Sequence, residues 1–306
     1  MNEQFISLLL VAAVLLSAPL LTAALGELIS EVAGVINIQL EGMMLMGAFT
    51  AMVGAFISHS IVIGFAAAAL GGLFIATLHG TICLVFRVNQ VVSGVVLNLL
   101  ALGITTFGLE VIFGSNFNRS VPTLDKVAIP GLSSLPLIGQ AFFNQPISVY
   151  AVFLAVPLLW WVLNRTVIGL ALRATGERPE AADALGVRVH RVRWLALLAC
   201  GALAGLGGAQ LTLVGLGFFT QNVTAGRGFI ALAAVIFGRW SPFGTAAAVL
   251  FFAMTDAFQI RAQALGIHAP YQLLVALPYL ATLIALAGLL RGMRPPAALA
   301  TNYETT

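Results

Sequence analysis

Arg173-Ala-Thr-Gly-Glu-Arg-Pro-Glu-Ala-Ala-Asp-Ala-Leu-Gly-Val187 is a polar stretch in a chain that is otherwise mostly apolar. Pro179 suits the first turn of a helix, where its missing N–H costs no hydrogen bond. Glu180 and Asp183 suit the positive end of a helix dipole, and Gly186 suits the residue that ends the helix. The pattern predicts a short polar helix of about two turns.

The composition around this stretch indicates a membrane protein. The wider segment Arg165–Arg193 holds six arginines and three acids. The 306-residue chain as a whole is 60% hydrophobic and 8% charged, with a mean hydropathy of +1.03. Water-soluble domains carry about 25% charged residues. We therefore expect an all-α polytopic membrane protein, with residues 1–306 forming a single transmembrane domain. A polar helix between spans has no core of its own to bury, so we expect it to face a soluble partner.

The lengths of the apolar runs predict the spans. A bilayer core of about 30 Å needs about 20 apolar residues per helix. We expect eight full spans, at Phe5–Leu25, Leu40–Ile57, Ile61–Phe86, Val91–Phe113, Ile147–Leu163, Trp194–Leu216, Phe243–Ile260 and Tyr271–Leu290.

Two further segments, Glu27–Ile38 and Ala225–Gly238, have helical composition but are too short to cross alone. They resemble the broken or re-entrant helices that line transport pathways. The alternative is that they are short tilted spans or interfacial helices. Each precedes a helix rich in glycine and alanine, which suggests that the chain has two related halves.

The arginines predict the orientation. Basic loops face the cytoplasm, so the segment 165–193, Arg87 and the tail pair Arg291 and Arg294 are expected inside. The polar loop 114–146, near charge balance, is then extracytoplasmic. If Glu27–Ile38 turns back without crossing, the N-terminus lies outside. The net charge of +3 is explained by the clustered arginines, and we expect no binding of nucleic acid.

Polar side chains inside the spans are the candidates for a translocation pathway, because an ionisable group at membrane depth is costly unless it is paired or hydrated. Four of them have a structural alternative: Glu41 caps a helix, Asn98 bridges helices, Arg227 forms a scaffold ion pair, and Asp256 sits at the membrane interface or pairs with Arg227 or Arg261. The candidate pathway residues are Asn37, Glu41, Asn98, Gln221, Arg227 and Asp256.

The chain offers little for catalysis. Its one lysine, Lys126, lies in the expected outer loop. A phosphate-binding loop for ATP requires a lysine after its glycines. We therefore expect no ATPase site in this chain and no enzymatic activity. The four histidines and two cysteines show no metal-ligand spacing, so no metal or cofactor is expected.

Three stretches resemble a known family. They are Gly34-Val-Ile-Asn-Ile-Gln-Leu-Glu-Gly-Met-Met-Leu-Met-Gly-Ala-Phe49, Gly176-Glu-Arg-Pro-Glu-Ala-Ala-Asp-Ala-Leu-Gly-Val187 and Thr224-Ala-Gly-Arg-Gly-Phe-Ile-Ala-Leu-Ala-Ala-Val-Ile-Phe-Gly-Arg-Trp240. Together they resemble ABC importer permeases of the ribose and branched-chain amino acid superfamily. The third is most similar to the subgroup that works with basic-membrane-protein-type lipoproteins in nucleoside uptake. The second contains Glu-Ala-Ala-x3-Gly, the core of the importer coupling loop, but lacks the extension that ends in a Leu-Pro pair.

The resemblance implies a permease subunit in the inner membrane of a bacterium. Its implied partners are a second related permease, an extracytoplasmic substrate-binding lipoprotein, membrane lipid, and ABC ATPase subunits that bind ATP and Mg²⁺. The segment 165–193 would be the cytoplasmic coupling loop. The residues expected to contact the ATPase are Arg173, Glu177, Glu180, Ala181, Ala182, Asp183 and Gly186.

The expected cargo is a nucleoside or a related riboside. The first alternative keeps the same machinery and imports simple sugars or branched-chain amino acids. A different class is an ion-driven secondary transporter, in which Asp256, Glu110 and Glu41 would be protonated during transport.

Overall fold

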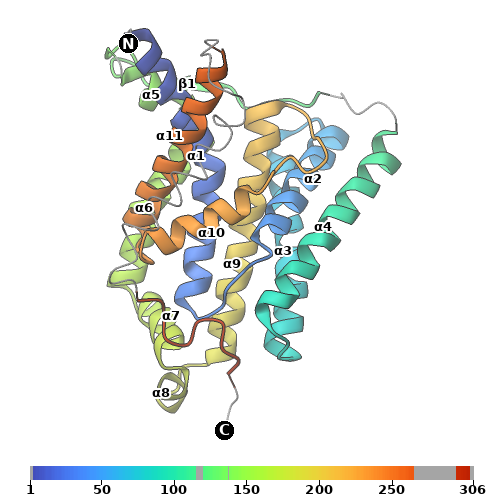
Figure 1. Cartoon of the computed structure of the whole chain (residues 1–306), viewed down its shortest axis with the longest axis vertical. Coiled ribbons are helices and arrows are strands. Elements are labelled where there is room, and N and C mark those ends of the chain that lie inside the picture. Colours follow the sequence, from blue (N-terminus) through green and yellow to red (C-terminus); the bar gives the residue numbers. More distant parts are fainter. Residues whose placement is uncertain (1–2, 115–119, 137, 265–293, 304–306) are drawn as a thin grey trace.

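The computed structural model describes residues 3–114, 120–136, 138–264 and 294–303, and this part of the chain is almost entirely helical (Figure 1). The elements are α1 (Glu3–Val32), α2 (Leu40–Ser58), α3 (Ile61–Gly80), the π-helical turn η1 (Thr81–Val85), α4 (Gln90–Phe113), β1 (Lys126–Ala128), α5 (Gly139–Phe143), β2 (Asn144–Pro146), α6 (Ile147–Arg165), α7 (Val167–Glu177), α8 (Pro179–Ala184), α9 (Val189–Gln210), the π-helical turn η2 (Leu211–Leu216), α10 (Arg227–Phe237) and α11 (Pro242–Ala264).

Seven helical stretches in the described residues are long and apolar enough to cross a membrane. They are Phe5–Val32, Leu40–Ser58, Ile61–Val85, Gln90–Phe113, Ile147–Arg165, Val189–Leu216 and Pro242–Ala262. These confirm seven of the expected spans and the predicted fold class, so the chain is a multi-pass membrane protein. The eighth expected span, Tyr271–Leu290, lies outside the described residues.

The first expected short helix is wrong. Glu27 and Glu31 belong to α1, which continues without interruption to Val32. The helix continues because both carboxylates are buried against partners inside the protein, so they do not need water at a helix end. The irregular backbone is instead the segment 33–39, which we call the α1–α2 break. Near its start lies Gly34, whose φ of +93° is a left-handed conformation that favours glycine.

The second expected short helix is confirmed, although it starts two residues later than predicted. Helix α10 has 11 residues, Arg227–Phe237, and it lies obliquely across the bundle (Figure 1). Ala225 and Gly226, just before it, have φ values of +46° and +85°. This turn sets the direction in which the helix leaves the preceding loop.

The centre of the bundle is built from α1 and α9, which lie side by side, with α2 and α3 next to α9 and with α11 and α6 next to α1 (Figure 1). Glycines let α9 approach its neighbours very closely. A Cβ atom added at Gly72 of α3 would lie 1.9 Å from the carbonyl oxygen of Gly201, and one added at Gly205 would lie 2.1 Å from that of Ala68. Backbone therefore touches backbone where these helices cross.

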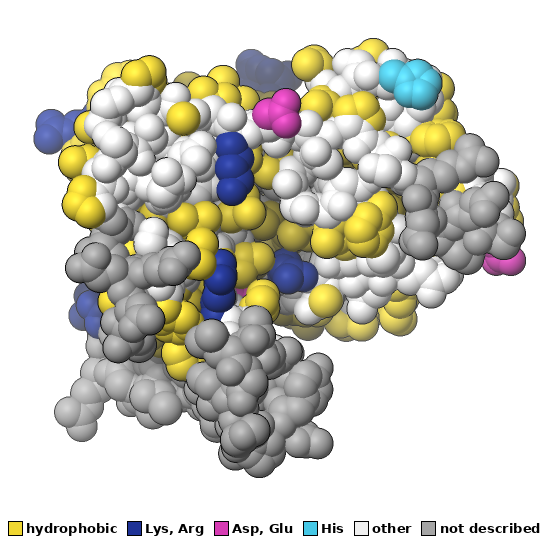
Figure 2. Space-filling model, turned by 90° about the horizontal axis from the view of Figure 1, so that it is seen from above, with side chains coloured by type: hydrophobic (Ala, Val, Ile, Leu, Met, Phe, Trp, Pro, Cys, Tyr) yellow, Lys and Arg dark blue, Asp and Glu magenta, His cyan; other side chains and the backbone are white. Residues whose placement is uncertain are grey.

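The two polar loops lie at opposite ends of the molecule. The N-terminus, β1 and α5 are at one end, while α8 and the segment 294–303 are at the other (Figure 1). Strand β1 pairs antiparallel with β2 in the register Lys126↔Pro146. Seen from the N-terminal end, hydrophobic side chains are spread over the face and a few basic side chains lie near its middle (Figure 2). The N-terminus shares its end with the loop 114–146 because α1 runs the whole length of the bundle, not because a short helix turns back.

Candidate functional site

Glu41, in the first turn of α2, holds the start of α10. Its carboxylate accepts hydrogen bonds from the Thr224 hydroxyl at 2.5 Å, the Gly226 N–H at 2.8 Å and the Gly228 N–H at 2.6 Å. A carboxylate at this place satisfies free N–H groups and complements the helix dipole. A Cβ atom at Gly228 would lie 2.4 Å from the Glu41 nitrogen, so this contact requires a glycine. The capping alternative is the observed one, with α10 as the capped helix.

Glu27 supports the α1–α2 break in a similar way. Its two carboxylate oxygens accept hydrogen bonds from the backbone N–H of Asn37 at 2.9 Å and from its side-chain amide at 2.8 Å. The Asn37 side-chain oxygen accepts from Gln39 at 3.0 Å, and the Cys200 thiol donates to Glu27 at 3.4 Å. One turn further along α1, the carboxylate of Glu31 accepts from the Trp240 indole. Neither acid was among the predicted pathway residues, although their position at the edge of an apolar run was a usable signal.

Asn98 joins α4 to the same region. Its amide donates to the carbonyl oxygen of Ile38 at 2.9 Å, and its oxygen accepts from the Gly42 N–H at 2.7 Å. The bridging alternative therefore describes Asn98. Both of its polar groups are occupied by the backbone around the break, so the side chain fixes where α4 sits.

A cavity of about 270 Å³ lies between α2, α4, the loop before α10 and α10 itself. Its lining includes Glu41, Asn98, Asn222 and Phe229, among apolar side chains. The Phe229 ring is 47% exposed. We call this space the α4–α10 cavity. It brings together two of the six predicted pathway residues and offers an aromatic face beside polar groups.

The other predicted pathway residues lie elsewhere. Arg227 lines a separate cavity of about 230 Å³ and lies 3.9 Å from Asp256, with the two side chains 26% and 32% exposed. Asn37 is fully buried, and Gln221 is exposed. The structure therefore does not gather the six residues into one chamber.

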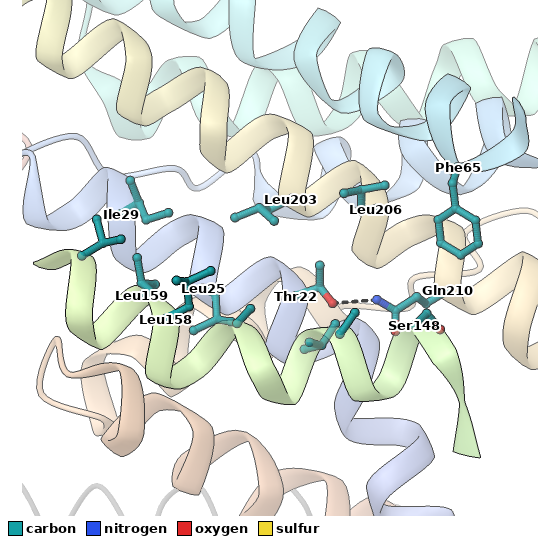
Figure 3. A pocket seen from close by; sticks show the side chains of 14 residues that line it. Thr22, Leu25, Ile29, Phe65, Ser148, Leu158, Leu159, Leu203, Leu206 and Gln210 are labelled. Atoms are coloured by element: carbon teal, nitrogen blue, oxygen red, sulfur yellow. Dashed lines mark hydrogen bonds between the residues drawn. The ribbon is translucent and has the colours of Figure 1, made fainter. Parts of the chain in front are cut away.

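A further cavity, of about 500 Å³, is lined mainly by leucine, isoleucine, valine and alanine of α1, α6 and α9. Phe65 of α3 closes one part of it, and the Gln210 amide donates to the Thr22 hydroxyl at 2.7 Å near the Ser148 end (Figure 3). Nothing in the sequence predicted this space, because its lining residues look like those of any membrane span. In the described residues, no three His, Cys, Asp or Glu side chains lie together as metal ligands would.

The expected coupling segment forms α7 and α8. Helix α8, Pro179–Ala184, begins with its proline and is followed by Gly186 at a φ of +85°, as the sequence predicted. Five of the seven predicted contact residues are exposed, Asp183 is partly exposed, and Ala182 is buried. The exposed ones are Arg173, Glu177, Glu180, Ala181 and Gly186. Leu185, directly after α8, is 86% exposed.

The family model described as branched-chain amino acid transport system / permease component matches residues 9–287. The chain belongs to this family. It is 36% identical to the guanosine ABC transporter permease protein NupQ of Bacillus subtilis, over 98% of this chain and 97% of that protein. It is also 36% identical to the nucleoside ABC transporter permease protein NupC of Lactococcus lactis, over 94% and 93% of the two chains.

A third relative, TsgC13 of Haloferax volcanii, is 40% identical over 86% of this chain and 80% of that one, and its name provisionally assigns it to glucose transport. A solved chain of a transporter described as metal-chelate type ABC, in an inward-facing conformation, has a TM-score of 0.52 at 16% identity. It covers 92% of this chain and 85% of that one, and it supports the fold. The predicted family is thus confirmed, and the chain is a permease component of an ABC transport system.

Proposed function

We propose that this chain is one permease subunit of an ATP-driven importer for nucleosides or related ribosides. The observation that carries the proposal is the 36% identity to a guanosine permease over 98% of the chain, supported by a nucleoside permease of similar coverage. ATP and Mg²⁺ would bind to separate ATPase subunits. The single lysine of this chain, Lys126, lies in β1, where it cannot serve a phosphate-binding loop before a helix.

The tip around α8 is the proposed contact with the ATPase. Leu185, 86% exposed directly after α8, would supply an apolar contact to the ATPase, and the exposed Glu180 in the first turn of α8 would supply charge. Hydrogen bonds to charged groups contribute roughly 1.5–3 kcal/mol each, which is enough to hold or loosen a small interface.

The α4–α10 cavity is the proposed place where cargo passes. A nucleoside combines a flat base with a ribose that carries hydroxyl groups. An exposed aromatic ring such as Phe229 suits stacking on a base, and the side chain of Asn222 suits hydrogen bonds to its polar edge. Because Glu41 and Asn98 already use their polar groups to hold backbone, we propose that they shape the cavity and leave recognition to Asn222 and Phe229.

The outer face of α4 is the proposed contact with a second permease. Val96, Leu100, Phe107 and Val111 are exposed along it, and α4 lies at the edge of the bundle (Figure 1). Membrane lipid would cover the rest of the apolar surface. The substrate-binding lipoprotein would dock at the opposite end from α8, near β1 and α5.

Uptake by a deletion strain tests the cargo. Cells lacking this chain should lose uptake of labelled guanosine and regain it when the chain is restored. A strain that keeps guanosine uptake but loses glucose uptake would favour the sugar alternative, which the similarity to TsgC13 supports. Transport in vesicles that contain this chain alone, without ATP, would instead indicate an ion-driven carrier.

Copurification tests the coupling role. A tagged chain should bring down an ATPase subunit, and the double variant Glu180→Ala/Asp183→Ala should reduce uptake while the subunit remains folded in the membrane. Glu110→Ala is the matched control, because Glu110 is also an exposed carboxylate but lies near the C-terminal end of α4 rather than on α8. Unchanged uptake in the double variant would show that α8 is not the coupling element.

A further inference from the structure

The segment 294–303, which we call the C-terminal strap, lies against the α8 end of the bundle (Figure 1). Two backbone hydrogen bonds attach it to different elements. The N–H of Ala298 donates to the carbonyl oxygen of Gly176, near the end of α7, at 2.8 Å. The N–H of Ala300 donates to the carbonyl oxygen of Gly34, in the α1–α2 break, at 3.1 Å. Two residues of the strap therefore connect the segment before α8 to the break.

Arg193 of α9 fixes the strap from beneath. Its side chain is 1% exposed, and its guanidinium donates to the carbonyl oxygen of Thr301 at 2.8 Å. The same guanidinium lies against Gly34, where an added Cβ atom would come within 2.9 Å of Arg193 Nη2. A buried charge is costly unless it is hydrogen-bonded. The strap supplies an acceptor for Nη1 of this buried guanidinium, and the missing side chain of Gly34 leaves room for Nη2.

Tyr303 attaches the strap to α8 itself. The side chain is 5% exposed and packs with Ala182 of α8 and Val189 of α9, and its ring lies 5.7 Å from that of His190. Burial, a hydrogen bond to the Asp183 carboxylate and the charge of Glu180 raise the pKa of the Tyr303 phenol. The phenol thus stays protonated at neutral pH and donates to Asp183.

The neighbouring residue extends the strap to a further element. The side-chain amide of Asn302 donates to the carbonyl oxygen of Arg87, between α3 and α4, at 2.7 Å. The strap therefore contacts α7, α8, α9, the α1–α2 break and the connection before α4.

We propose that the C-terminal strap transmits movement of α8 to the α1–α2 break, with Arg193 and Tyr303 as positioning residues for transport. Three residues after Gly34 the break reaches Asn37, and four residues later Glu41 holds α10 beside the α4–α10 cavity. A displacement of α8 therefore has a continuous hydrogen-bonded route to the cargo passage. This inference rests on the proposed contact between α8 and an ATPase.

The test uses the complete transporter in proteoliposomes, with its ATPase, its binding protein and labelled guanosine as the probe. Removing residues 296–306 should leave the ATPase bound but lower guanosine uptake about tenfold, which corresponds to about 1.4 kcal/mol of lost coupling. The stimulation of ATP hydrolysis by guanosine-loaded binding protein should disappear, so more ATP is consumed per guanosine imported. Removing only residues 304–306, which retains Tyr303, is the matched control and should behave like the wild type.

Point variants separate transmission from folding. Tyr303→Ala should uncouple hydrolysis from uptake, whereas Tyr303→Phe keeps the ring against Ala182 and should retain most of the coupling. Arg193→Lys should retain more coupling than Arg193→Met, because a lysine can still donate to the Thr301 carbonyl and a methionine has no donor. Variants that lose uptake only in proportion to the amount of folded transporter would overturn the inference, and so would a truncated chain with normal stimulation. If the wild-type chain itself binds no ATPase, the proposed function fails instead.

Discussion

The α1–α2 break and the start of α10 are both irregular backbone inside a helical bundle, and each depends on one buried carboxylate. Glu27 holds the break through Asn37, in a place that is fully enclosed. Glu41 holds α10 through Thr224, Gly226 and Gly228, and it lines a cavity. In both regions a buried carboxylate holds irregular backbone in place. The first carboxylate is enclosed by protein, whereas the second lines the proposed cargo passage. Changes at the second region should affect transport more than changes at the first.

Glu41→Ala should have the largest effect. It removes the acceptor for three hydrogen bonds, each worth roughly 1.5–3 kcal/mol when the acceptor is charged. We expect the free energy of unfolding in detergent to fall by about 3 kcal/mol or more, and guanosine uptake to be lost. Thermal unfolding combined with uptake measures both. If Glu41→Ala unfolds at the same temperature as the control Glu110→Ala, the cap that Glu41 forms on α10 is contradicted.

Gly228→Ala should be next in size. The added methyl group would lie 2.4 Å from the Glu41 nitrogen, so α10 must shift, at a cost of about 2 kcal/mol. Gly103→Ala in α4 is the control, since a Cβ atom there meets nothing within 4 Å. Equal unfolding temperatures for the two variants would contradict the close approach of α10 to α2.

Asn37→Ala addresses the enclosed region. It leaves Glu27 with the backbone N–H of the same residue but without the side-chain amide, which should lower stability by about 1.5 kcal/mol. A double-mutant cycle with Glu27→Gln measures the coupling between the two side chains. Strictly additive effects would refute the contact. Loss of uptake in Asn37→Ala together with retained uptake in Glu41→Ala would reverse the comparison.

Asp256→Asn should have the smallest effect. Its pair with Arg227 is long, at 3.9 Å, and both side chains are partly exposed. Such pairs contribute less than about 1 kcal/mol. A cycle with Arg227→Gln, followed by unfolding, gives the interaction energy. An interaction energy well above about 1 kcal/mol would mean that the pair is a principal link between α10 and α11.

The spans were predictable because an apolar run of sufficient length has few alternatives in a membrane, and the short α10 was predictable from its flanking glycines. The polar residues were harder. In the sequence, a carboxylate such as Glu27 indicates the end of a helix. In the structure, Asn37 and Cys200 donate hydrogen bonds to it, so the helix continues past it. The α4–α10 cavity was only partly foreseen, through Glu41 and Asn98.

Two features had no usable signal at all. The lining of the large cavity between α1, α6 and α9 is indistinguishable by composition from lipid-facing surface. The C-terminal strap is attached largely through backbone groups, such as the N–H groups of Ala298 and Ala300. Every residue carries these groups, so the sequence does not reveal where they bond.

The glycine crossings of α2, α3 and α9 also limit how the transporter can open. Sliding one of these helices along another by a single residue would bring a side chain against backbone at Gly72, Gly205 or Gly208, where an added Cβ atom already lies within 2.1 Å of a carbonyl oxygen. The glycine contacts therefore resist sliding of α2, α3 and α9 past one another. We expect movements that open a passage to occur at the edge of this block, where α4 and α10 lie.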